Sequence, residues 1–215
     1  MTQTYIIDFD STLITMESLD ELARIALAQR GDAAEVMAKL EDITQKGMLG
    51  EIGFDESLRL RLSLFSPDRE HVKQAVELFK TNISPSALAH IDWFQENAEH
   101  IYIVSGGFED YILPIATELG LREDHIFANR FTYDESGEIT GFDESNLLSQ
   151  RQGKVAQIKS LGFDEPIIMI GDGYTDYETR EHDAVNEFWA FTETVNRPKI
   201  AGLADKVIND FAQVV

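Results

Sequence analysis

Two aspartates separated by a single residue follow a short apolar run near the start of the chain. The run Tyr5–Ile7 predicts a buried strand, with Asp8 and Asp10 at its carboxyl end. Because side chains alternate along a strand, we expect both carboxylates on the same side of it. Two carboxylates this close repel each other, so they are retained together mainly where a cation lies between them or where they share catalytic work. A plain strand end with an Asx-type turn is the simpler interpretation.

Two more polar clusters follow apolar runs later in the chain. The run 100–104 leads into Ser105 and Gly106, and the run 166–170 leads into Asp172. In a parallel sheet, ligands bind beyond the carboxyl ends of the strands, so these clusters and the first aspartates would meet at one site. Taken alone, a Ser-Gly-Gly triplet is typical of a turn, and a Gly-Asp-Gly triplet is typical of a loop.

A lysine and a further aspartate complete the group of candidate residues. Lys154 follows a glycine at the start of an amphipathic stretch, and Asp176 follows Asp172 in the same loop. A lysine near a helix start is ordinarily solvated, but among several carboxylates it would balance their charge. The five histidines show no spacing of metal ligands, so an oxygen-rich site, and hence Mg²⁺, is favoured for any cation here.

The order of the apolar runs predicts the fold that would position these residues. Runs at 5–7, 100–105, 166–170, 188–191 and 206–208 alternate with helical patterns. Strands that alternate with helices form a mostly parallel sheet with helices on both faces. We therefore expect an α/β fold with a Rossmann-like, doubly wound parallel sheet.

Four helical patterns without a strand occupy residues 15–79 and interrupt the α/β pattern. We expect them to form a helical cap inserted after the first strand, so that residues 1–14 and 80–215 make up the α/β catalytic core. Ser18 is expected to cap the first of these helices, because a glutamate stands at capping-box spacing from it. In the core, residues 126–142 are expected to contain a hairpin with arms at 131–133 and 138–142 and a turn at 134–137.

The composition excludes several classes of partner. The 215 residues include 39 acidic and 18 basic side chains, and the net charge of −21 repels nucleic acid and anionic membranes. The chain has no cysteine, which excludes disulfides and thiolate metal sites. No apolar run approaches the roughly 20 residues of a membrane span, and no secretory leader is recognisable. We expect a cytoplasmic protein and leave a homodimer open.

Taken in order, the motifs DFDST, SGG, Lys154 after a glycine, and GDGYTD resemble those of the haloacid dehalogenase-like phosphatases. Further stretches, among them LDELA, VSGGF and FANRF, resemble the phosphoserine phosphatase family in particular. The resemblance implies a Mg²⁺-dependent phosphatase that acts on a small phosphate ester through an aspartyl-phosphate intermediate. In that family the substrate is phosphoserine, and the reaction is a step of serine biosynthesis.

The resemblance implies a role for each charged residue at the strand ends. Asp8 would be the nucleophile, and Asp10 would protonate the leaving alkoxide and then deprotonate the attacking water. Mg²⁺ would be held by the Asp8 carboxylate, the Asp10 backbone carbonyl and Asp172. Lys154 would balance the charge of the transferring phosphoryl group, and Asp176 would orient Lys154 or hold metal-bound water.

The inserted helices carry residues that match the family's recognition of an amino-acid phosphate. Glu17 matches the glutamate that binds the substrate ammonium, and Arg61 matches the arginine that binds its carboxylate. Met48 and Phe54 match the apolar residues that cover the substrate. From the residues alone, Glu17 is equally a helix-start charge and Arg61 a solvated arginine.

Three further residues complete the predicted phosphate and substrate contacts. The Ser105 hydroxyl and the Gly106 backbone N–H would bind phosphate oxygens. Thr175 stands where the family commonly has asparagine, and residues 186–198 are more aromatic than the family's usual continuation. Three alternatives therefore stay open: the same chemistry on another small phosphorylated metabolite, transfer of the phosphoryl group to another alcohol, and a non-catalytic phosphate- or metal-binding protein.

Overall fold

A six-stranded parallel sheet forms the centre of the molecule. The structure is a computed structural model, and it describes residues 3–215. Met1 and Thr2 lie outside the described residues; they begin the terminus that is expected to carry no leader. The strands are β1 (Thr4–Ile7), β2 (Ile101–Phe108), β3 (Ile126–Asn129), β6 (Ile167–Gly171), β7 (Glu187–Phe191) and β8 (Lys206–Ile208). They lie in the order β3-β2-β1-β6-β7-β8, and every neighbouring pair is parallel. The predicted α/β class with a doubly wound parallel sheet is confirmed.

The strand order changes direction between β1 and β6. From β1 the chain continues outward through β2 to β3, whereas from β6 it continues through β7 to β8 on the other side. Open α/β sheets bind ligands at such a switch point, beyond the carboxyl ends of the strands. Asp8 directly follows β1, and Asp172 directly follows β6.

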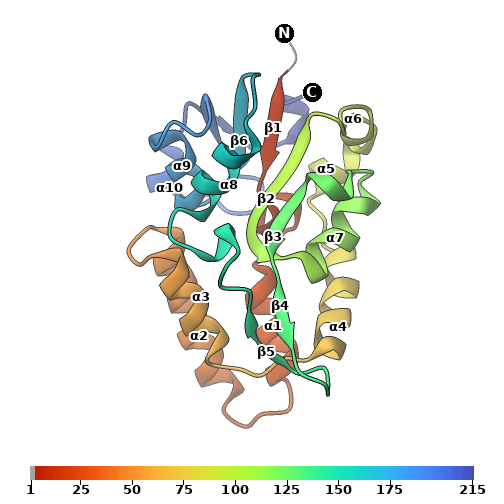
Figure 1. The fold of residues 1–215 in the computed structure, drawn as a ribbon, viewed down its shortest axis with the longest axis vertical. Coiled ribbons are helices and arrows are strands. Elements are labelled where there is room, and N and C mark those ends of the chain that lie inside the picture. The colour runs from red at the N-terminus through yellow and green to blue at the C-terminus, as the bar shows by residue number, and fades with distance from the viewer. Residues whose placement is uncertain (1–2) are drawn as a thin grey trace.

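Helices cover both faces of the sheet, and Figure 1 shows α8 to α10 and α5 to α7 on opposite sides of the strands. These helices are α5 (Pro85–Ala89), α6 (Ile91–Glu96), α7 (Glu109–Glu118), α8 (Gly153–Leu161), α9 (Tyr174–Glu181) and α10 (Pro198–Ala201). Alternation along β1 separates the two apolar cores: Ile7 belongs to the cluster of Tyr111 in α7, and Ile6 to that of Val155 in α8.

Four consecutive helices follow β1 and lie together beyond the carboxyl ends of the strands (Figure 1). This helical segment consists of α1 (Ser18–Leu27), α2 (Ala33–Met48), α3 (Phe54–Leu62) and α4 (Arg69–Lys80). Its entry and exit are paired, since Ile14 and Ile83 form an antiparallel bridge. Within residues 3–215, no helix combines the length and apolarity that a bilayer crossing requires.

The two arms of the predicted hairpin are confirmed. They form a two-stranded antiparallel sheet of β4 (Phe131–Tyr133) and β5 (Ile139–Phe142). Only the start of the predicted range is wrong, because residues 126–129 form β3, which pairs with β2 in the main sheet.

The predicted cap of the first helix is wrong by one residue. Glu17 is the N-cap of α1, and Ser18 is its first helical residue. The Ser18 backbone N–H donates a 2.8 Å hydrogen bond to Asp10, and its hydroxyl donates to Tyr111 of α7 at 2.9 Å. The serine therefore uses its polar groups to join α1 to the sheet edge and to α7.

Candidate active site

A pocket lies between the carboxyl edge of the sheet and the helical segment. It is lined by ten of the residues predicted to react or to bind substrate: Asp8, Asp10, Glu17, Met48, Phe54, Arg61, Ser105, Gly106, Lys154 and Thr175. It is also lined by five residues that were not predicted: Leu19, Thr44, Gly47, Ser57 and Gly107. The other two predicted residues, Asp172 and Asp176, have carboxylate oxygens within 4.8 Å of those of Asp8.

Asp8 is buried, and two donors hold one of its oxygens. The Phe9 backbone N–H donates to Asp8 Oδ1 at 2.8 Å, and Lys154 Nζ lies 2.8 Å from the same oxygen. Both contacts fall on Oδ1, so Oδ2 is the oxygen left for another role. With one oxygen held by a cation and a backbone donor, the carboxylate has a fixed position from which the other oxygen can act as a nucleophile.

The expected strand geometry for Asp8 and Asp10 is wrong, although both reach the pocket. β1 ends at Ile7, and Asp10 lies in a turn over Phe9–Leu13 that is closed by a hydrogen bond from Ile14 N–H to the Phe9 carbonyl. Alternation with period two therefore does not apply between the aspartates. The turn places Ser11 at φ 52°, a left-handed conformation that a non-glycine residue seldom adopts outside functional sites.

The Asp10 carboxylate is aimed at the start of α1. Its Oδ1 accepts the hydrogen bond from the Ser18 backbone N–H at 2.8 Å. Burial raises the pKa of Asp10 well above its usual range, and the nearby carboxylates of Glu17 and Asp8 raise it further. A carboxyl group with a raised pKa retains its proton near neutral pH and can give it to a leaving oxygen.

Lys154 joins the carboxylates at the two central strand ends. Its Nζ lies 2.6 Å from Asp176 Oδ1 and 2.8 Å from Asp8 Oδ1, and the side chain is only 6% exposed. Burial alone would lower the pKa of Lys154, but Asp176 and Asp8 raise it above its usual value, so the amine stays charged. The Gly173 backbone N–H donates to Asp176 Oδ2 at 3.0 Å. Both oxygens of Asp176 are therefore engaged, and the residue orients Lys154.

The environment of Asp172 fits a cation with oxygen ligands. Within residues 3–215, neither oxygen of its buried carboxylate accepts a hydrogen bond. Burial raises the pKa of Asp172 well above its usual range, although the guanidinium of Arg197 opposes this rise. Carboxylate oxygens of Asp8, Asp172 and Asp176 lie within 4.8 Å of one another. The buried, unsatisfied oxygens of Asp172, at this distance from two further carboxylates, suit a hard divalent cation such as Mg²⁺.

Arg197 belongs to this site and was not predicted. It is buried, and its guanidinium lies 3.0 Å from Asp172 Oδ2 and 3.3 Å from Glu17 Oε1. The contact with Asp172 is an ion pair without hydrogen-bond geometry. Arg197 lies just before α10, in the loop that follows β7. The rule that sites gather at strand ends could have identified it, but no motif surrounds it.

Glu17 is held on one side and open on the other. Its Oε1 accepts a hydrogen bond from the Ser11 hydroxyl at 2.8 Å and one from Arg197 at 3.3 Å. Both bonds fall on Oε1, and Glu17 lines the pocket, so Oε2 is the oxygen available to a ligand. The left-handed conformation of Ser11 is therefore coupled to the position of this carboxylate.

Ser105 and Gly106, which were predicted to bind phosphate, belong to a strand and not to a turn after it. β2 extends through Ser105 and Gly106 to Phe108. The Ser105 hydroxyl oxygen accepts from the Gly107 backbone N–H at 3.1 Å, so the hydroxyl proton is free to be donated. A Cβ at position 106 would lie 2.5 Å from Phe54 Cζ, so only glycine lets the aromatic ring of α3 reach the sheet edge.

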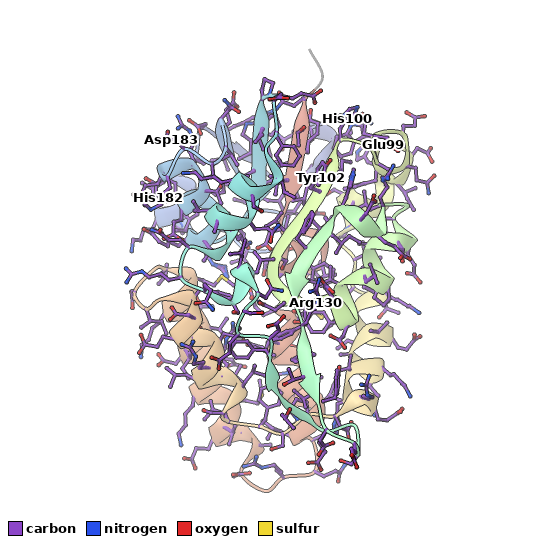
Figure 2. All side chains as sticks on the ribbon, in the orientation of Figure 1. Glu99, His100, Tyr102, Arg130, His182 and Asp183 are labelled. Atoms are coloured by element: carbon purple, nitrogen blue, oxygen red, sulfur yellow. The ribbon has the colours of Figure 1, made fainter. Side chains whose placement is uncertain are left out.

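The histidines lie away from the pocket. Of the residues that the structure describes, no histidine lines the cavity. Figure 2 shows His100 at the end of the molecule opposite the helical segment and His182 at one edge of the half that holds the sheet. Within residues 3–215, the group of side chains close enough to hold a metal ion together consists of Asp8, Asp172 and Asp176.

Comparison with known proteins gives consistent matches. A family model described as haloacid dehalogenase-like hydrolase matches residues 6–181. The chloroplastic phosphoserine phosphatase of Arabidopsis thaliana is 33% identical over 211 residues, which cover 97% of this chain and 69% of the relative. A phosphoserine phosphohydrolase-like protein from Francisella tularensis has a TM-score of 0.89 at 30% identity, with 99% of this chain and 98% of the other covered. A phospho-aspartyl intermediate analogue of phosphoserine phosphatase has a TM-score of 0.78 at 27% identity, with 100% and 98% covered.

Proposed function

Because the chain belongs to the haloacid dehalogenase-like hydrolases and, within them, to the phosphoserine phosphatase family, we propose that it hydrolyses O-phospho-L-serine to L-serine and phosphate. The observation that carries this proposal is one pocket that holds Asp8 together with Glu17 and Arg61. Phosphoserine carries an ammonium and a carboxylate beside its phosphate, so it requires an anion and a cation next to the nucleophile. The reaction would be a step of serine biosynthesis.

In the first step, Asp8 Oδ2 attacks phosphorus. The bond from phosphorus to the serine oxygen breaks as the new bond forms, which gives an aspartyl-phosphate and a serine alkoxide. Lys154, which is 2.8 Å from Asp8 Oδ1, balances the negative charge on the phosphoryl group. The Ser105 hydroxyl and the Gly106 backbone N–H donate to phosphoryl oxygens, since both residues line the pocket.

Asp10 moves the protons in both steps. Its raised pKa lets the carboxyl group carry a proton, which it gives to the serine alkoxide as the alkoxide leaves. The resulting carboxylate takes a proton from a water molecule. The water oxygen attacks phosphorus, the bond to Asp8 breaks, and phosphate leaves with the Asp8 carboxylate restored. An aspartate at this position favours transfer to water and hence hydrolysis.

The residues around Asp172 would hold Mg²⁺. Asp172 and Asp8 would supply carboxylate oxygens and Asp10 its backbone carbonyl, since both oxygens of Asp176 are engaged by Lys154 and Gly173. When bound, Mg²⁺ neutralises charge shared between the phosphate and the carboxylates. Arg197 supplies part of the same positive charge, because its guanidinium lies beside Asp172.

We also propose that residues 15–79 act as a cap domain over a core of residues 1–14 and 80–215. Support comes from the pocket itself, which is lined both by strand ends and by residues of α2 and α3. A cap excludes water other than the molecule that the second step consumes. Location in the cytoplasm and a homodimer stay predictions.

The experiment that tests this function is a panel of small phosphate esters assayed for phosphate release with and without Mg²⁺. We expect the highest kcat/KM for O-phospho-L-serine, loss of activity with a chelator, and recovery with Mg²⁺. A kcat/KM about tenfold or more higher for another ester would overturn the assignment of phosphoserine as the substrate. Undiminished activity in excess chelator would overturn the proposed requirement for Mg²⁺. Phosphate binding without turnover would favour a non-catalytic protein, and faster release in the presence of an alcohol acceptor would favour a phosphotransferase.

A further inference from the structure

A buried aspartate of α1, Asp20, forms an ion pair with Arg61. Asp20 Oδ1 lies 3.6 Å from Arg61 Nη1, and the two side chains are each 8% exposed. The Thr44 hydroxyl donates a 2.8 Å hydrogen bond to the same oxygen of Asp20. Asp20, Thr44 and Arg61 come from α1, α2 and α3, so this contact joins three helices of the helical segment at one point.

Arg61 is held at one end and unpaired at the other. It lines the pocket, whereas Asp20 is not among the lining residues. Within residues 3–215, the buried Nε of Arg61 has no hydrogen-bond partner. Burying an arginine donor without a partner is costly unless a ligand supplies one. The guanidinium edge made by Nε and Nη2 is the edge suited to a bidentate carboxylate contact.

The contacts of Asp20 explain how that edge is kept in place. An arginine side chain has many rotamers, and a buried cation is stable only beside an anion. Asp20 supplies the anion at Nη1 and therefore holds that end of the guanidinium in place. Thr44 in turn fixes the Asp20 oxygen that faces Arg61. Neither residue contributes to the chemistry at the sheet edge.

We propose that Asp20, held by Thr44, is a positioning residue that presents the Nε–Nη2 edge of Arg61 to the carboxylate of the substrate. The inference rests on the proposed function, because it assigns a role in recognising the carboxylate of phosphoserine. Asp20 acts through Arg61, and its loss affects a substrate only where that substrate has a carboxylate to bind.

The test compares two substrates in four proteins. O-Phosphoethanolamine keeps the phosphate and ammonium of phosphoserine but has no carboxylate. We expect Asp20→Asn to raise KM for phosphoserine about tenfold or more, with kcat and both constants for phosphoethanolamine within about threefold of the wild type. In an Arg61→Ala background, the same substitution should add less than about twofold, since coupled residues are not additive.

A second pair of variants leaves the buried charge in place. Thr44→Val removes the hydroxyl that holds Asp20 and should raise KM for phosphoserine selectively. Thr44→Ser keeps the hydroxyl and should restore the wild-type KM. Thermal unfolding of each variant identifies any loss that comes from unfolding, and the Thr44 pair decides the question if Asp20→Asn does not fold.

Three results would overturn the inference. The first is an equal effect of Asp20→Asn on KM for both substrates. The second is full additivity of the effects of Asp20→Asn and Arg61→Ala on KM for phosphoserine. The third is the same KM for phosphoserine in the two Thr44 variants. Failure of the proposed function would appear earlier and separately, as a wild-type enzyme with no preference for phosphoserine over phosphoethanolamine. If the wild type has that preference and Asp20→Asn retains it, only the inference fails.

Discussion

The two sides of the pocket hold their charges differently. At the sheet edge, Lys154 contacts two carboxylates at 2.6 and 2.8 Å, and Asp176 has both oxygens engaged. On the side of the helical segment, Glu17 has one oxygen occupied, and Arg61 has a buried donor without a partner within residues 3–215. At the sheet edge Lys154, Asp8 and Asp176 are thus paired with one another and Asp172 is left for a cation, whereas the side of the helical segment leaves polar groups that an organic ligand would complete.

The difference follows from what each side has to do. Phosphoryl transfer requires a fixed nucleophile and fixed counter-charges, and parallel strands hold their ends rigidly relative to each other. Recognition of an amino acid requires one free anion and one free cation, each kept in place by neighbours outside the pocket. Ser11 and Arg197 do this for Glu17, and Asp20 does it for Arg61.

The largest effect should come from Asp8→Asn at the sheet edge. Asparagine keeps the size of the side chain and an oxygen for the Phe9 N–H, but it cannot attack phosphorus. We expect kcat to fall on the order of a thousandfold or more for every substrate. The measurement is phosphate release at saturating phosphoserine, with thermal unfolding as the check on folding. A variant that retains a tenth of the wild-type kcat would remove Asp8 from the role of nucleophile.

Lys154→Met should come next, because it leaves two buried carboxylates without their shared cation. We expect kcat to fall about a hundredfold. The free energy of unfolding should fall by about 3 kcal/mol, the usual scale for breaking a buried ion pair from one side. Denaturant unfolding and initial rates measure the two effects.

Lys159→Met is the matched control, since Lys159 lies on the same helix and is exposed. It should leave the rate and the unfolding free energy unchanged. Comparable losses in both variants would mean that Lys154 acts through the stability of α8 and not through charge at the site.

The smallest expected effect is a pH dependence of substrate binding that arises on the side of the helical segment and not at the sheet edge. Burial raises the pKa of Asp20 to about 6, and Arg61 opposes the rise while Glu17 and Glu41 add to it. Above this pH Asp20 is ionised and forms the ion pair with Arg61. As the pH falls through 6, Asp20 takes up a proton and the ion pair weakens.

The ratio of KM for phosphoserine to KM for phosphoethanolamine should therefore rise about threefold between pH 7.5 and 5. The ratio cancels the ionisation of the phosphate, which both esters share. Asp20→Asn should remove the pH dependence of the ratio. A ratio that is flat in the wild type, or that is equally steep in Asp20→Asn, would contradict this account of the group.

The sheet edge was largely predictable from the sequence because Asp8, Ser105 and Asp172 lie in or next to the strands that position them, although Lys154 and Asp176 lie on α8 and α9. Asp8 and Asp172 directly follow apolar runs, so strand topology alone brings them together. The turn after β1 was not predictable, since no local pattern indicates the left-handed Ser11 or its hydrogen bonds to Glu17 and to the Met16 carbonyl.

The residues that support recognition were missed for a physical reason. An aspartate in the first turn of a helix is ordinarily a solvated charge, and only the packing of α1 against α2 and α3 buries Asp20. Arg197 lies in a loop without a motif and reaches Glu17 from the far end of the sequence. Contacts between distant elements decide both positions, and local patterns carry no signal for them.

The most direct test of the division between chemistry and recognition is kcat/KM of the wild type and of Arg61→Ala on phosphoserine and on phosphoethanolamine. We expect the wild type to prefer phosphoserine by about a hundredfold, and Arg61→Ala to lose most of that preference while its activity on phosphoethanolamine stays within about threefold. An equal loss on both esters would make Arg61 a structural residue and would contradict the assignment of recognition to the helical segment.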